Sequence, residues 1–373
     1  MKTAVNIARI IVGVLFIFSG LVKAIDPLGL AYKMQEFFEV WAADGYFPSL
    51  MNLLIAQALW FSIIMITLEI LLGLALLIGW RKHFVLALLL LLIIFFTFLT
   101  SYVLFTGKIR ACGCFGDCIP LTPIQTFTKD IILLLLIIFL TFNKRHIHRL
   151  FRGIAGTAIM LIALAVFTFL QLYVLKHLPL KDCLPYRKGN NILELRKMPE
   201  DAVPDEYTYT FVYEKEGSKK EFTADKLPDS SWKFADRKQV LVKKGFNNIP
   251  QINDFSLSDS AGVNVTEELL GEKKDYYLFF IKDLDESASK WTTNFIALWE
   301  KAKKQNMPIY IVTADRDRVN TFFNVLNKYD VAVYTCDATA IKTAARANPT
   351  LFVMQGPVVQ AKYSWADLDK LIK

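Results

Sequence analysis

Long apolar runs fill the first half of the chain and end near residue 175. A helix needs roughly 20 mainly apolar residues to cross about 30 Å of hydrocarbon. Runs of this kind predict four membrane-spanning helices within residues 1–150 and a fifth within 151–175. Their expected bounds are 7–25, 53–79, 84–105, 127–142 and 153–175. The first half therefore predicts a membrane α-helical bundle.

Beyond residue 175 the apolar runs are short and alternate with polar positions, as in a water-soluble domain. Residues 176–250 read as a connecting module, in which strands 207–213 and 219–223 flank a turn and predict a β-hairpin. From 251 to 373, short apolar strands alternate with helical stretches and end in a strand pair and a last helix, which predicts a C-terminal α/β domain. The expected strands are 276–281, 309–313, 331–335, 351–354 and 358–363.

The distribution of charge along the chain indicates the kind of partner. The net charge is +8, but residues 1–175 hold 13 Lys and Arg against 7 Asp and Glu, whereas residues 176–373 hold 30 against 28. A nearly balanced soluble half lacks the basic stripe that binds phosphates, so we expect a lipid membrane and not nucleic acid as the partner.

The basic residues of the membrane half gather on one side of the predicted bundle. Cytoplasmic segments are rich in Lys and Arg, so this side is expected to face the cytoplasm. An odd number of spans then places residues 176–373 outside it, in the periplasm if the chain lies in a bacterial inner membrane. A cleaved signal peptide ending near Ala24 is an alternative for the first span that leaves this orientation unchanged. The residues on the basic side are Lys2, Arg9, Arg81, Lys82, Lys144, Arg145, Arg149 and Arg152.

Three of the five cysteines, Cys112, Cys114 and Cys118, lie in the loop between the third and fourth spans. The loop is predicted to be extracytoplasmic, where disulfides persist. The three are candidate catalytic residues for disulfide exchange, since a thiolate near a disulfide is what exchange needs. A structural disulfide that fixes the loop is an open alternative. A zinc site is a third, disfavoured because the loop contains no His and lacks the usual paired spacing.

Outside the loop, Glu69 is a second candidate for function, because a carboxylate within a membrane span is costly. Its alternative role is a packing residue, protonated or paired with Arg9 or Lys23. Cys183 follows the fifth span, where it either meets the cysteine loop or remains a free thiol. Cys336 ends a predicted strand, and burial as an inert side chain is the simpler interpretation.

The first span and the cysteine loop together resemble known membrane families. The opening of the chain resembles the DoxX family, in the pattern Arg9-(x)3-Gly13, Phe16-(x)3-Gly20-(x)2-Lys23 and Asp26-Pro27. The segment Cys112-Gly113-Cys114-Phe115-Gly116, with Pro120-Leu121, resembles the MauE branch. A MauE-like role implies support for methylamine dehydrogenase maturation beside a thioredoxin-like partner. A DoxX-like role implies membrane redox chemistry, with quinone as a possible cofactor.

Residues 254–373 resemble a thioredoxin-like domain of the peroxiredoxin and TlpA type, beginning at Asp254-Phe255-Ser256-Leu257. The resemblance implies a cis-proline at Pro349, which is a candidate substrate-binding residue. Where that family carries Cys-x-x-Cys, this chain has Asp283-Leu284-Asp285-Glu286. The domain is therefore expected to bind extended peptides without reductase chemistry.

Together these patterns favour a membrane protein for extracytoplasmic thiol, disulfide or electron handling, with protein clients or thiol redox partners. An oxidoreductase linked to quinone is one form of this hypothesis. A non-enzymatic envelope assembly factor with structural cysteines is the alternative, and a proton or solute pathway through Glu69 is a third.

Overall fold

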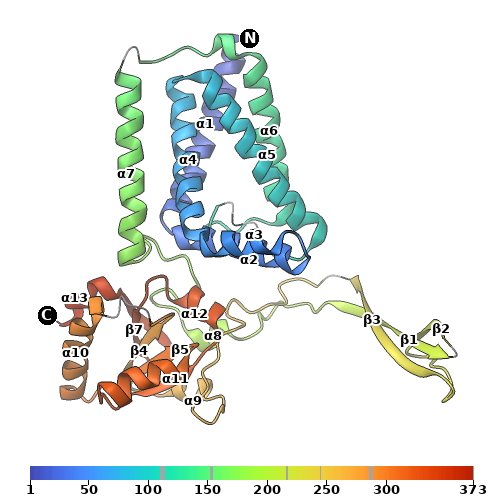
Figure 1. Ribbon diagram of the computed structural model, residues 1–373, viewed down its shortest axis with the longest axis vertical. Helices are drawn as coiled ribbons and strands as arrows, with labels where there is room; N and C mark the ends of the chain where they lie inside the picture. Colours follow the sequence, from blue (N-terminus) through green and yellow to red (C-terminus); the bar gives the residue numbers. More distant parts are fainter. Residues whose placement is uncertain are drawn as a thin grey trace.

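The computed structural model describes residues 1–109, 113, 115–151, 154–215, 217–243, 245–284 and 289–372. Among these residues, five helices are long and apolar enough to cross a membrane. They run side by side and form one bundle, with the last helix standing along its flank (Figure 1). The predicted membrane bundle is confirmed. The five are α1 (Lys2–Ala24), α4 (Ala58–Ile78), α5 (Lys82–Thr106), α6 (Pro123–Phe142) and α7 (Ala155–His177).

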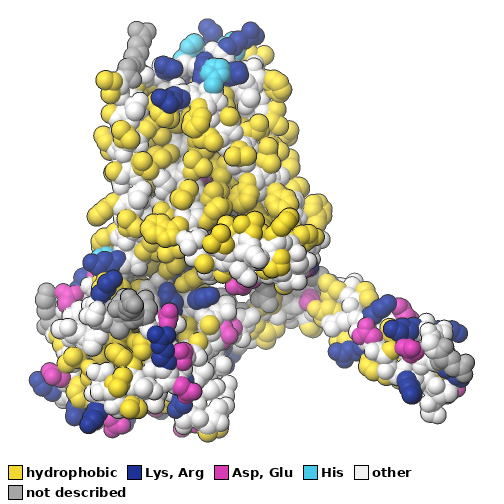
Figure 2. Space-filling model, viewed as in Figure 1, with side chains coloured by type: hydrophobic (Ala, Val, Ile, Leu, Met, Phe, Trp, Pro, Cys, Tyr) yellow, Lys and Arg dark blue, Asp and Glu magenta, His cyan; other side chains and the backbone are white. Residues whose placement is uncertain are grey.

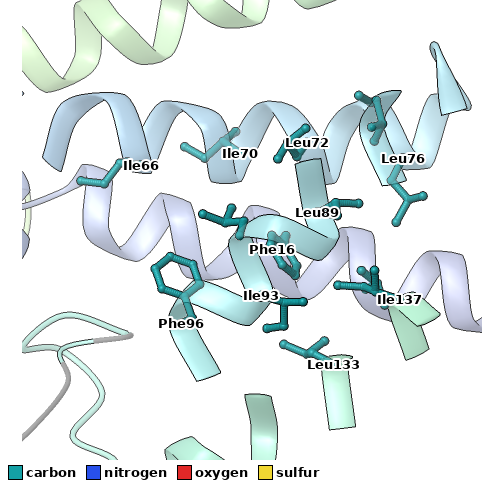
Figure 3. Close-up of a cluster of buried hydrophobic side chains, with 14 of the residues drawn as sticks. Phe16, Ile66, Ile70, Leu72, Leu76, Leu89, Ile93, Phe96, Leu133 and Ile137 are labelled. Carbon is teal, nitrogen blue, oxygen red and sulfur yellow. The ribbon is translucent and has the colours of Figure 1, made fainter. Parts of the chain in front are cut away.

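The interior of the bundle is apolar and closely packed. Figure 3 shows Phe16 of α1, Ile70 of α4, Ile93 of α5 and Ile137 of α6 converging in one cluster of buried side chains. Small residues let α1 and α4 approach closely, as is common between membrane helices. A Cβ placed on Gly73 would lie 2.8 Å from the carbonyl oxygen of Gly13, so this contact requires glycine.

Two further helices lie across the end of the bundle that faces the soluble domain (Figure 1): α2 (Pro27–Ala43) and α3 (Pro48–Ala56). The apolar pattern did not predict α2, and it predicted that the second span begins at residue 53. That start is wrong, because the backbone leaves the helical conformation at Gln57 and residues 53–56 belong to α3. Hydropathy alone does not reveal a break between two apolar helices.

A three-stranded antiparallel sheet projects as an arm from the connecting segment (Figure 1). It comprises β1 (Glu206–Lys215), β2 (Ser218–Thr223) and β3 (Lys233–Lys243), in the order β2-β1-β3. The predicted hairpin corresponds to β1 and β2. Strand β3 was not predicted, because its residues are all exposed and show no alternation of apolar and polar faces. A short helix, α8 (Ile192–Leu195), precedes the arm, and a 3-10 turn, η1 (Lys144–His146), links α6 to α7.

The C-terminal domain contains a five-stranded mixed sheet in the order β6-β5-β4-β7-β8. Strands β4, β5 and β6 are parallel to one another, whereas β7 runs antiparallel to β4 and forms the terminal antiparallel hairpin with β8. The predicted α/β domain is confirmed. Its elements are α9 (Thr266–Gly271), β4 (Asp275–Ile281), α10 (Ser289–Lys304), β5 (Ile309–Thr313), α11 (Arg316–Asn320), the π-helical turn η3 (Thr321–Leu326), β6 (Ala332–Thr335), α12 (Ala338–Ala344), β7 (Thr350–Gln355), β8 (Val358–Ser364), the 3-10 turn η4 (Trp365–Asp367) and α13 (Asp369–Ile372).

The sheet is covered on both faces, which explains its continuous apolar strands. Residues 276–281 of β4 are all buried, with Tyr276, Leu278 and Phe280 in one cluster and Tyr277, Phe279 and Ile281 in the other. Helix α12 and the chain that follows it lie on the side of this domain nearest α2 (Figure 1). This places the edge of the sheet that carries Pro349 close to the bundle.

Candidate functional site

A disulfide links the bundle to the segment that leads into the α/β domain. Cys118 bonds to Cys183, 65 residues later, and their Cα atoms lie 4.9 Å apart. Cys118 therefore pairs outside the loop, and Cys183 is not a free thiol. Cys112 and Cys114 lie outside the described residues, so their candidate role stays a prediction.

The described part of the cysteine loop is fixed against the bundle. Gly113 and Gly116 have φ angles of +70° and +59°, in the left-handed region that favours glycine. A Cβ on Gly113 would lie 3.0 Å from Cγ of Lys33 on α2, so the centre of the Cys-Gly-Cys segment rests against this helix. Phe115 packs on Phe18 of α1, with ring centroids 5.9 Å apart.

An aspartate precedes each cysteine of the disulfide and pairs with a buried cation of the α/β domain. Asp117 accepts a hydrogen bond of 2.8 Å from Nη2 of Arg346. Asp182 accepts one of 2.6 Å from Nζ of Lys362. The Arg346 and Lys362 side chains are only 6% and 8% exposed, so both cations depend on these partners.

Arg346 also reaches the start of α2. Its Nε donates to Oδ2 of Asp26 over 2.7 Å, while Oδ1 of Asp26 caps the helix by accepting from the backbone N–H of Gly29. The ring of Tyr32 lies 5.3 Å from the guanidinium carbon, within cation–π range. Asp26, Asp117 and Arg346 thus form one charge network that joins the bundle to the α/β domain.

Lys282, at the end of β4, lies beside this network. Its ammonium group donates to the hydroxyl of Tyr32 and to the carbonyl oxygen of Arg346, each over 3.2 Å. Burial lowers the pKa of Lys282 to about 7, and the positive charge of Arg346 acts in the same direction. Burial likewise raises the pKa of Tyr32 to about 12.

The edge of the sheet that carries thiol chemistry in thioredoxin-like domains has no described cysteine here. Asp283 and Leu284 follow β4, and Asp285 and Glu286 lie outside the described residues. The Asn348 side chain accepts from the backbone N–H of Lys282 and donates to the carbonyl of Asp283, over 2.9 and 2.6 Å. The peptide bond before Pro349 is cis, as expected, and Pro349 is buried. Its role in binding substrate stays a prediction.

Cys336 lies next to this edge but is not a reactive thiol. The side chain is 3% exposed and packs in the apolar cluster of the sheet. Burial raises its pKa to about 12, so the thiolate that exchange requires does not form near neutral pH. The structure thus agrees with an inert, buried cysteine.

A cleft of about 330 Å³ opens between α2 and α12, beside the charge network. Its lining includes Glu36 and Glu39 of α2, Lys342 of α12 and Arg346 just after α12, and the loop that carries the disulfide contributes Asp117. Pockets at domain junctions with converging polar groups are common binding sites. The principal side chains lining it are those of Tyr32, Lys33, Glu36, Glu39, Lys342 and Arg346.

Glu69, the candidate within the membrane, is paired. Lys23 of α1 donates to both of its carboxylate oxygens over 3.0 and 2.8 Å, and Ser19 donates to Oε1 over 2.7 Å. Glu69 is 3% exposed and Lys23 is 2% exposed. Arg9 is used elsewhere, since it donates to the carbonyl oxygens at the end of α4. The geometry matches a paired packing residue.

Quinone, the cofactor that the DoxX resemblance implies, stays a prediction. The described bundle has an apolar groove of about 320 Å³ between the end of α4, the start of α5 and α7, where Trp80 donates to Thr157. The lining of this groove runs from Leu68, near the middle of α4, to Arg81 beyond the end of that helix, and it includes neither cysteine of the disulfide. The described residues also form no cluster of three or more His, Cys, Asp and Glu for a metal.

Comparison with known proteins agrees with the membrane half of this description. Residues 1–143 match the family described as methylamine utilisation protein MauE. The membrane region is of the MauE type. This MauE-type region contains α1 to α6 and the cysteine loop, and it is the MauE rather than the DoxX resemblance that is supported.

Other matches are partial. "Protein TlpB" of Flavobacterium psychrophilum is 35% identical over 137 residues, which are 36% of this chain and 35% of that protein. The chain thus spans about a third of the length of this curated relative. Residues 207–244, which form the arm, match a domain of unknown function, DUF8463. No solved structure matches the chain.

Proposed function

We propose that this chain exchanges thiols and disulfides on the extracytoplasmic side of a bacterial cytoplasmic membrane. In this proposal the α/β domain binds protein clients without thiol chemistry of its own. The observation that carries the proposal is the Cys118–Cys183 disulfide, which joins the MauE-type bundle to the α/β domain. Both cysteines border a small pocket with Asp117 and Asp182, next to the cleft between α2 and α12.

A single turnover of thiol–disulfide exchange needs no further oxidant, because the disulfide itself accepts the electrons. A client thiolate attacks one sulfur of Cys118–Cys183, and the other sulfur leaves as a thiolate. The second client thiol then resolves the mixed disulfide. The client gains a disulfide, and Cys118 and Cys183 each become thiols, so two electrons and two protons leave the client.

The charge distribution supports the orientation. Figure 2 shows Lys, Arg and His side chains gathered at the end of the bundle that carries the N-terminus. Lys and Arg favour the cytoplasmic face, which supports an extracytoplasmic position for the opposite end, with the disulfide and the α/β domain. Disulfides persist in that compartment.

A specific observation favours the alternative of an assembly scaffold. The disulfide and the two buried ion pairs fasten the α/β domain to the bundle, and Cys336, the cysteine of that domain, is buried. In this alternative the disulfide stays closed and the cleft only binds proteins. Exchange with a client separates the two functions.

The test uses the purified full chain in detergent and an equal amount of a short synthetic peptide with two thiols. The proposal predicts close to one peptide disulfide formed per chain. The pair of substitutions Cys118→Ser and Cys183→Ser should reduce this yield at least tenfold, whereas Cys336→Ser should leave it unchanged. A wild-type chain that oxidises no peptide contradicts the proposal and supports the scaffold.

A further inference from the structure

The disulfide holds together two carboxylates that come from distant parts of the chain. Asp117 belongs to the loop before α6, and Asp182 follows α7. Each is the immediate neighbour of a bonded cysteine, so the covalent bond fixes the spacing of the two carboxylates. The α/β domain presents Arg346 and Lys362 to this pair, over 2.8 and 2.6 Å.

We infer that Cys118–Cys183 is a redox-controlled clamp, whose reduction releases the α/β domain from the bundle and widens the cleft between α2 and α12. The inference rests on the proposed function, because a thiol-bearing client or partner is what opens the disulfide. It adds regulation to that site, since one exchange event both oxidises the client and changes how the domain is held.

The physical reason is that buried cations need their partners. Breaking the disulfide lets Asp117 and Asp182 move with separate segments. Lys362 then loses Asp182, and Arg346 keeps Asp26 but loses Asp117, although both cations are less than a tenth exposed. A buried charge without its partner is strongly destabilising, so the docked arrangement loses its advantage over a solvated one. The domain stays tethered by the chain that follows α7.

Other contacts between the bundle and the α/β domain do not depend on the disulfide, among them the ion pair of Arg346 with Asp26 and a contact at the end of α7. Nδ1 of His177 lies 3.0 Å from Oδ2 of Asp367, which also accepts a hydrogen bond from Ser364. This contact fixes the far side of the α/β domain. Release is therefore expected as a partial rotation that widens the cleft between α12 and α2, and not as full detachment.

Coupling between two events is reciprocal. If the closed disulfide favours docking, then docking favours the closed disulfide to the same degree. Weakening the charge network must therefore make the disulfide easier to reduce, with no change at either sulfur. Two electrons and two protons from a dithiol such as dithiothreitol convert the disulfide into two thiols, and the dithiol becomes a cyclic disulfide.

The experiment measures hydrogen exchange on the full chain in lipid nanodiscs, with and without dithiothreitol. Reduction should speed exchange at least tenfold in residues 338–349 and in the first turns of α2, and leave residues 206–243 of the arm unchanged. The double variant Cys118→Ser and Cys183→Ser should show the fast pattern without reductant. Cys336→Ser should match the wild type.

A second measurement tests reciprocity. Asp117→Asn changes a carboxylate that is 40% exposed, so the fold should persist. The equilibrium constant for reduction by dithiothreitol should rise at least tenfold, about 30 mV for two electrons. Lys243→Gln, on the arm and 67% exposed, is the matched control and should change nothing.

The outcomes separate the clamp from the exchange activity. Unchanged hydrogen exchange after complete reduction overturns the clamp, even if client peptides are oxidised normally. An equilibrium constant that Asp117→Asn does not shift also overturns it. If dithiothreitol releases the domain but client peptides never reduce the disulfide, the clamp stands and the proposed exchange function fails.

Discussion

Nζ of Lys23 lies 2.8 Å from Oε2 of Glu69, and both side chains are almost completely buried between α1 and α4. The carboxylate also accepts from Ser19, and the ring of Phe96 lies 4.8 Å from the ammonium group. Two charges inside a membrane bundle are tolerable when they are paired and hydrogen-bonded. The pair therefore fixes how α1 packs on α4.

Removing one partner of this pair should destabilise the bundle. Glu69→Gln leaves the Lys23 ammonium group without a counter-charge, and we expect a loss of roughly 3–5 kcal/mol in the free energy of unfolding. The double variant Lys23→Met and Glu69→Leu should be much more stable than Glu69→Gln. Thermal unfolding in detergent checks both. A Glu69→Gln variant of normal stability that has lost activity would instead support a functional carboxylate.

The contact between Gly13 and Gly73 should be equally sensitive. Gly73→Ala places a Cβ 2.8 Å from a backbone oxygen of α1, so the helices must move apart. Overpacking of this kind costs roughly 1–3 kcal/mol. Gly271→Ala is the matched control, because its added Cβ meets no atom within 4 Å. Equal unfolding temperatures for the two variants would contradict the close packing of α1 and α4.

The lowered pKa of Lys282 predicts that the stability of the protein depends on pH. Its pKa is lowered from 10.5 to about 7 in the folded protein, so the unfolded chain binds more protons between these values. Stability should therefore rise as the pH increases from about 7 toward 10, and this contribution should be constant below 7. Lys282→Met should flatten that part of the profile. The check is the unfolding temperature of the full chain across this range, where an identical slope in the variant would contradict the assignment.

The orientation has its own test. The one-sided distribution of Lys and Arg predicts an extracytoplasmic α/β domain. A reporter that is active only in the cytoplasm, fused after Lys373, should show no activity, whereas the same reporter fused after Lys144 should be active. An active reporter at Lys373 would overturn the compartment on which disulfide exchange depends.

The spans and the α/β domain could be predicted because each rests on a local pattern. Apolar runs of sufficient length identify a membrane helix, and the strands of the C-terminal domain are apolar because both sheet faces are covered. The arm strand β3 and the break at Gln57 lack such a signal. One is exposed along its whole length, and the other separates two equally apolar helices.

The site was only partly predictable for a different reason. The loop that contains Cys118 could be recognised from its spacing, but its bond to Cys183 depends on how α7 returns the chain to the same end of the bundle. The sequence did not identify Arg346 as a site residue, because a single arginine after a helix looks the same in sequence as an arginine on the surface. Its importance comes from Asp26, 320 positions away, which only the folded chain brings within 2.7 Å.

Thiol trapping in intact cells tests the exchange hypothesis most directly. A chain that retains only Cys118 and Cys183 is pulsed with a mild dithiol, quenched with acid at successive times and labelled with a mass tag on every free thiol. The account predicts that both cysteines shift from untagged to doubly tagged during the pulse and return to the untagged state after it. Two results together would contradict it. The pair remains untagged throughout, and a second variant, with serine in place of Cys112, Cys114, Cys118 and Cys183, keeps its normal function.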